Sequence, residues 1–119
     1  DSTYLLLCGG DLYQVLTEGG KDAAKALERL KRSGVDNAAL KKLLWQVEPL
    51  RIAHRLDPSK TWLYSARFDE VVPPVLSKRL AETIGLDPLH HRDLLATHYS
   101  GIMFLPGVLR KMCDKAGVK

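Results

Sequence analysis

The sequence has little cysteine, no long apolar run and no concentrated positive charge. Its two cysteines, Cys8 and Cys113, lie far apart in a chain of 119 residues, so neither a disulfide framework nor a thiolate metal site is predicted, and both are expected to be buried free thiols. The longest apolar run, 4–8, is far shorter than the ~20 residues of a membrane span. The net charge of +4 comes from cations interleaved with acids, which does not favour nucleic-acid binding.

The N-terminus also lacks targeting features. No basic segment followed by an apolar one opens the chain, and its first residue is Asp1 rather than methionine. We therefore expect a processed or truncated product, and the compartment stays undetermined. An apolar content of 45% with 27% charged residues is typical of a globular protein.

Apolar and β-branched residues form two clear strand patterns, and a shorter one follows. Residues 3–8 form an unbroken apolar run, which suits a parallel strand covered on both faces. Residues 61–66 are rich in β-branched and aromatic residues, and 93–97 form the third, short pattern. Helical periodicity and capping signals predict helices between and after them. The predicted helices span 11–18, 21–33, 37–47, 49–55, 74–84 and 101–115.

This alternation predicts the α/β class, with about three parallel strands and flanking helices. A fully apolar strand at 3–8 needs neighbours and helices on both sides, and 119 residues hardly provide them. We therefore expect residues 1–119 to be a partial domain whose larger sheet precedes Asp1. The helices within 21–47 are either a cap or part of an ordinary crossover.

The strongest chemical signal is the stretch 65–73, Ser-Ala-Arg-Phe-Asp-Glu-Val-Val-Pro. It places Asp69 just after a parallel strand, at the sheet edge where open α/β sheets place their ligands. There a carboxylate can accept a histidine N–H, fix the tautomer and stabilise the imidazolium. Asp69 can equally shape the turn or cap the helix near Pro74, and spacing alone favours neither role.

The order strand, Asp-x-Val-Val-Pro, amphipathic helix resembles the acid segment of α/β-hydrolases, especially their prolyl-oligopeptidase-like and acyl-esterase branches. Residues 48–56, Glu-Pro-Leu-Arg-Ile-Ala-His-Arg-Leu, are similar to the helix that often precedes that strand in the superfamily. The resemblance covers most of the chain and implies that Asp69 is the acid of a catalytic triad.

The resemblance also implies a histidine after the next strand, where His98 stands. Asp69 followed by His98 has the chain order of this fold, in which the serine comes first. His98 would then be the general base towards the serine and the acid towards the leaving group. Many relatives have glycine before this histidine, whereas Thr97 stands here, and a structural role capping the last helix is the alternative.

Other residues compete for these roles. His90 and His91 with Asp93 resemble metal ligands, but adjacent histidines point apart and no further ligands have suitable spacing, so they are expected in a surface loop. His54 precedes the acid, in the wrong order, and is read as structural. Asp11 follows the first strand at the same sheet edge, as the triad acid of some α/β-hydrolases does, but a helix cap is the favoured role.

No Gly-x-Ser-x-Gly motif occurs, so the nucleophilic serine and its oxyanion hole would lie upstream of this chain. The expected function is that of a C-terminal segment of a serine hydrolase, which cleaves ester or peptide bonds through an acyl-enzyme and is inactive alone. Its expected partners are an ester or peptide substrate and the missing N-terminal half, with self-association of the chain alone, and no cofactor or metal is predicted. The alternative is a non-catalytic α/β fragment that binds a partner through its unpaired sheet edge.

Overall fold

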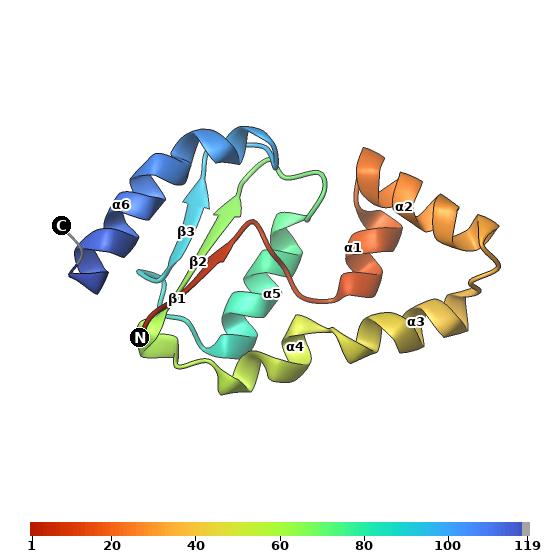
Figure 1. Cartoon of the computed structure of the whole chain (residues 1–119), viewed down its shortest axis with the longest axis horizontal. Coiled ribbons are helices and arrows are strands. Elements are labelled where there is room, and N and C mark those ends of the chain that lie inside the picture. Colours follow the sequence, from red (N-terminus) through yellow and green to blue (C-terminus); the bar gives the residue numbers. More distant parts are fainter. Residues whose placement is uncertain (118–119) are drawn as a thin grey trace.

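The computed structural model describes residues 1–117, without the side chain of Lys21, and contains a parallel sheet of three strands flanked by helices (Figure 1). The strands are β1 (Thr3–Leu6), β2 (Thr61–Ala66) and β3 (His91–Leu94), in the order β1-β2-β3. Leu5 of β1 lies opposite Leu63 of β2, and Leu63 lies opposite His91 of β3. The α/β class and the parallel pairing predicted from the sequence are thus confirmed.

The helices occupy the predicted places with small shifts at their ends. Between β1 and β2 lie four α-helices and two 3₁₀ turns, α5 follows β2, and the C-terminal helices follow β3. Their bounds are α1 (Leu12–Glu18), α2 (Lys21–Arg32), α3 (Asn37–Gln46), α4 (Pro49–Ile52), the 3₁₀ turns η1 (Ala53–Arg55) and η2 (Pro58–Lys60), α5 (Pro74–Ile84), the 3₁₀ helix η3 (Ser100–Phe104) and α6 (Leu105–Ala116).

The core lies between the sheet and α5. Helix α5 begins at Pro74, which favours a first turn, and ends at Gly85, whose φ of 81° is a conformation that glycine adopts without strain. Its predicted apolar face is buried, and Leu80 and Ile84 pack with Ala53 of η1. Leu5 of β1 also packs against this cluster. One face of the sheet is therefore covered by α5.

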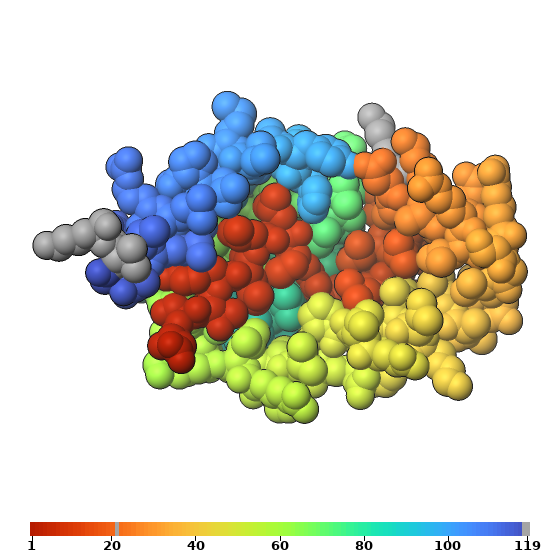
Figure 2. Space-filling model, in the orientation of Figure 1, coloured from red at the N-terminus to blue at the C-terminus, as the bar shows by residue number. Residues whose placement is uncertain are grey.

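The opposite face of the sheet contacts α6. Because successive strand residues point to opposite faces, Tyr4 and Trp62 lie on the side away from Leu5. Their rings stack at 5.3 Å, and the Lys115 ammonium of α6 lies over Trp62. Strand β2 is largely buried, whereas β1 pairs only with β2 among residues 1–117 and is partly exposed. Figure 2 shows this strand uncovered at the surface between α6 and α4.

Helices α1 to α3 extend the molecule to one side of the sheet (Figure 1). Their arrangement gives extents of 50 × 29 × 23 Å and a radius of gyration of 15.5 Å. A compact domain of this length would have a radius of gyration of about 13.5 Å. The segment predicted as a cap or crossover therefore projects beyond the sheet (Figure 1). Among the described residues, no helix is long and apolar enough to cross a bilayer.

Two strand boundaries differ from the sequence prediction. Strand β1 ends at Leu6 rather than at residue 8, because Leu7 has a φ of 49° and turns the chain out of the sheet. Strand β3 begins at His91 rather than at Asp93 and ends at Leu94, opposite the last residue of β2. The sequence pattern did not reveal the start of this strand because its residues there are polar, and a strand at the edge of a sheet needs few apolar side chains.

The cysteines differ from each other in their environment. Cys8 is half-buried, and burial raises the pKa of its thiol. Cys113 is exposed on α6, so the prediction that both thiols are buried was wrong for this residue. The amphipathic pattern of α6 leaves Val108 as its buried residue, whereas Cys113 lies on another side of the helix.

Candidate active site

The loop after β2 holds Asp69 at the carboxyl edge of the sheet. The backbone N–H of Arg67 donates to the Leu94 carbonyl and that of Phe68 to the Ala96 carbonyl, at 2.9 and 3.0 Å. These bonds tie the loop to the chain that leaves β3. Asp69 is only 6% exposed, and its Oδ1 accepts the N–H groups of Val71 and Val72, each at 2.8 Å.

The loop after β3 brings His98 against this carboxylate. Nδ1 of His98 lies 2.8 Å from Oδ2 of Asp69, the oxygen that the turn does not use. Because an ionised carboxylate can only accept a hydrogen bond, this contact favours the tautomer with the proton on Nδ1 and the lone pair on Nε2. Asp69 thus shapes the turn with one oxygen and contacts an imidazole with the other.

The neighbours of His98 fix its loop. Thr97 and Ser100 hydrogen-bond each other through their hydroxyl groups at 3.0 Å, and the Thr97 N–H donates to the Ser100 Oγ. The Tyr99 ring meets the His98 ring edge to face, and its hydroxyl donates to Asp22 of α2. The His98 side chain is 28% exposed. The imidazole is therefore anchored on its Nδ1 side and accessible elsewhere.

Two cavities border His98. One, of about 330 Å³, lies between the end of β1 and the residues of η3 and α6. The other, of about 320 Å³, lies between the Asp69 loop and α2 and is lined in part by Asp22, Lys25 and Glu70. The ring is therefore bordered by open space in two places.

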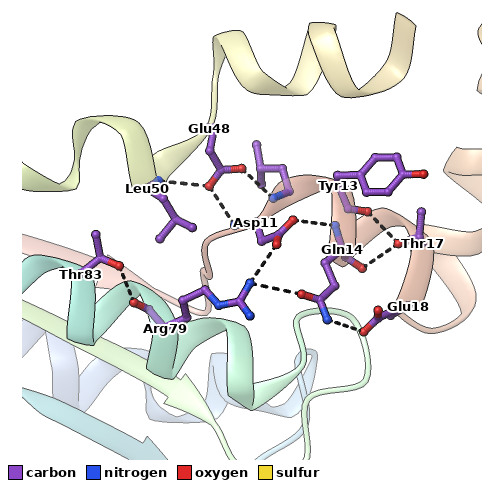
Figure 3. A network of polar contacts seen from close by, with 10 residues as sticks. Asp11, Tyr13, Gln14, Thr17, Glu18, Glu48, Leu50, Arg79 and Thr83 are labelled. Carbon is purple, nitrogen blue, oxygen red and sulfur yellow. Dashed lines mark hydrogen bonds and ion pairs between the residues drawn. The ribbon is translucent and has the colours of Figure 1, made fainter. Parts of the chain in front are cut away.

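Asp11, the rival acid, is a helix cap. Its Oδ1 accepts the N–H of Gln14 at 3.1 Å, and its Oδ2 forms an ion pair with Arg79 of α5 at 2.8 Å. Figure 3 shows Asp11 directed towards these partners. The favoured capping role is thus confirmed, and no hydrogen bond within residues 1–117 connects Asp11 to His98.

Glu48 is a structural carboxylate that sequence reasoning missed. It is 6% exposed, and its two oxygens accept the N–H groups of Asp11 and Leu12, each at 2.8 Å, and that of Leu50 at 3.1 Å (Figure 3). It therefore joins the loop after β1 to the start of α4. The dipeptide Glu48-Pro49 was its only sequence signal, because proline favours the first turn of a helix and the residue before it caps that turn.

The remaining histidines have structural neighbours or face solvent. His91 lies in β3, with Nε2 2.8 Å from the Ser65 hydroxyl, which also donates to Asp93 at 2.5 Å. His90 stacks on Trp62 at 4.5 Å between ring centroids. The predicted surface loop was wrong for His91, which lies in β3 and pairs with β2, whereas His90 does lie in the turn before β3, half-buried against Trp62. His54 is exposed in η1.

No group of three or more His, Cys, Asp or Glu side chains with the arrangement of a metal site occurs in the described part of the chain. His90 and His91 engage different neighbours, as expected for adjacent residues.

No protein-family model, curated protein or solved structure matches this chain.

Proposed function

We propose that this chain supplies the acid and the histidine of a serine hydrolase of the α/β-hydrolase fold, which cleaves ester or peptide bonds. The observation that carries the proposal is the 2.8 Å contact between Asp69 Oδ2 and His98 Nδ1, on adjacent loops at the carboxyl edge of a parallel sheet. A serine from a segment outside this sequence would complete the triad.

Asp69 would orient and stabilise the base. The N–H groups of Val71 and Val72 hold its Oδ1, so that Oδ2 stays directed at His98. The buried carboxylate favours the Nδ1-protonated tautomer and stabilises the imidazolium that forms when Nε2 takes a proton. This chain thereby fixes the geometry of proton transfer before any substrate binds.

The reaction would proceed in two steps, acylation and deacylation. In acylation the serine Oγ attacks the substrate carbonyl carbon while His98 Nε2 takes the hydroxyl proton. Nε2 then gives this proton to the leaving alcohol or amine as the bond between the carbonyl carbon and the leaving oxygen or nitrogen breaks. Water attacks the resulting acyl-enzyme in the same way, and Nε2 returns the proton to the serine Oγ. The oxyanion-hole donors would come from outside this sequence.

The exposed edge of β1 is where a further part of the sheet would join. The strand is apolar and pairs on one side only within residues 1–117, and an unpaired edge of this kind tends to acquire a partner strand. We assign this edge to the segment that contains the serine, and expect the chain alone to self-associate through it. Helix α2 adjoins the His98 loop through the Tyr99–Asp22 hydrogen bond, which supports a cap role for the helices within 21–47.

The same edge supports the second candidate, a non-catalytic α/β fragment that binds a partner by strand addition. In that case the Asp69–His98 pair would only join two loops. The two candidates differ in whether the protein forms a covalent acyl intermediate.

The test is pre-steady-state hydrolysis of p-nitrophenyl acetate by a polypeptide that extends this sequence to include the upstream segment. We expect a burst of nitrophenol close to one equivalent, followed by slower turnover, because acylation and deacylation are separate steps. A stably folded extended polypeptide with neither a burst nor turnover on ester and peptide substrates would favour the non-catalytic candidate.

A further inference from the structure

The cavity between β1 and η3–α6, called the apolar cleft below, is bordered by His98. Its volume of about 330 Å³ is at the lower end of the range of ligand sites, ~300–1,000 Å³. Apart from His98, Tyr99 and Gly101, its lining is aliphatic and consists of Leu6, Leu7, Leu94, Ile102, Leu105 and Val108. A group bound in the apolar cleft would thus find almost only hydrocarbon and would lie beside the proposed base.

The backbone at the end of β1 forms one wall of this cleft. Leu7 has a φ of 49°, a strained conformation for a non-glycine residue that recurs at functional sites. Gly101 packs against it, and a Cβ on Gly101 would lie only 2.8 Å from Leu7 Cδ1. The end of the Leu7 side chain would have to shift to admit that Cβ, so η3 lies close to Leu7 here.

The mouth of the apolar cleft continues as exposed apolar surface. Ile102 and Met103 of η3 are 68% and 79% exposed, and Tyr99 and Phe104 beside them are exposed as well. Apolar surface that gathers in one place commonly marks a binding site. Tyr99 and Ile102 belong both to this exposed surface and to the lining of the cavity at His98.

The second cavity at His98 has the opposite character. Asp22, Lys25 and Glu70 contribute charged groups to its wall, alongside Phe68 and Val71. An aliphatic chain would have to desolvate these charges, whereas the apolar cleft presents no charge of this kind. The two sides of His98 therefore separate an apolar from a polar part of a substrate.

We infer that the apolar cleft takes the aliphatic chain of an ester substrate, an inference that rests on the proposed function. The aliphatic side chains that line the cleft favour a hydrocarbon chain over a peptide, because the backbone N–H and C=O groups of a peptide would find no hydrogen-bond partners there. Each methylene that the cleft buries strengthens binding about fourfold, so selectivity should rise steeply with chain length.

The test uses Ile102→Arg, which places a charge in the cleft at an exposed position, so folding is not at risk. Ile52→Arg is the matched control, because Ile52 is also exposed but lies on α4, outside the cleft. In the extended polypeptide, kcat/KM is measured on p-nitrophenyl esters of two to eight acyl carbons and on acetates of alcohols of two to eight carbons. Comparing the two series shows whether the chain in the cleft is the acyl or the alcohol part.

We expect Ile102→Arg to lower kcat/KM about tenfold on the eight-carbon member of one series and less than twofold on the shortest ester, with Ile52→Arg unchanged throughout. Leu105→Ala, which enlarges the cleft, should move the preferred length of that series upward. An unchanged length profile in both series, or a uniform loss on all esters, would overturn the inference while leaving the proposed hydrolase activity intact.

If no ester is hydrolysed, the proposed function is contradicted, and a binding measurement then tests the assignment of the cleft separately. The 119-residue chain is titrated with the fluorescent fatty acid cis-parinaric acid. We expect Ile102→Arg to weaken binding about tenfold and Ile52→Arg to leave it unchanged. Equal affinities of the two variants would overturn the assignment of the cleft.

Discussion

His98→Ala in the extended polypeptide is expected to abolish hydrolysis of an activated ester. In the proposed mechanism Nε2 of His98 takes the serine proton, and Asp69 holds that ring through Nδ1. Asp69→Asn should lower kcat by about 10⁴-fold, as the corresponding change does in a chymotrypsin-type triad, because the amide disturbs the imidazole tautomer. Steady-state kinetics on p-nitrophenyl acetate measure both losses.

Asp11→Asn is the control for this experiment. Asp11 lies in the loop after β1, at the same edge of the sheet, but it caps α1 and pairs with Arg79. Its variant should therefore keep turnover within a few-fold of that of the unchanged protein. If Asp69→Asn kept full turnover and Asp11→Asn lost it, the acid would lie after β1 and the assignment of Asp69 would be wrong.

Glu48→Ala is expected to lower the free energy of unfolding markedly. The change leaves the N–H groups of Asp11, Leu12 and Leu50 without their acceptor. Unsatisfied buried donors cost about 1–3 kcal/mol each, and partial access to water reduces this, so we expect roughly 3 kcal/mol in total. Urea denaturation followed by circular dichroism measures the free energy of unfolding.

Asp36→Ala is a matched comparison, because Asp36 is an exposed carboxylate that accepts one N–H at the start of α3. Its loss should cost about 1 kcal/mol, the usual magnitude for a helix cap. Equal losses for the two variants would show that Glu48 acts as an ordinary cap and does not hold the loop after β1 to α4. The loop also contains Asp11, whose φ of 59° needs such support.

Local patterns predicted the elements whose signals lie within a few residues. Strand β2 has its predicted bounds, and α5 runs from Pro74 to the residue before Gly85, because strand composition and capping residues act locally. The juxtaposition of Asp69 and His98 was also predicted, since both follow parallel strands and the carboxyl ends of such strands meet at one edge.

Other features that depend on distant contacts were not predicted. The start of β3 at His91 depends on pairing with Leu63, and the end of β1 depends on the turn at Leu7. Glu48 was missed because its partners at Asp11 and Leu12 lie 36 or 37 residues away in sequence. Cys113 is exposed because a different side of α6 meets the sheet. The helical periodicity of the apolar residues alone does not decide which side that is.

The central claim is that Asp69 holds the His98 ring through Nδ1, and the ¹H–¹⁵N NMR spectrum of the chain tests it most directly. Long-range correlations at a pH where the ring is neutral identify which His98 nitrogen carries the proton. We predict an Nδ1-protonated ring whose proton resonates far downfield, and loss of that signal in Asp69→Asn but not in Asp11→Asn. A neutral ring protonated on Nε2, unaffected by Asp69→Asn, would contradict the account.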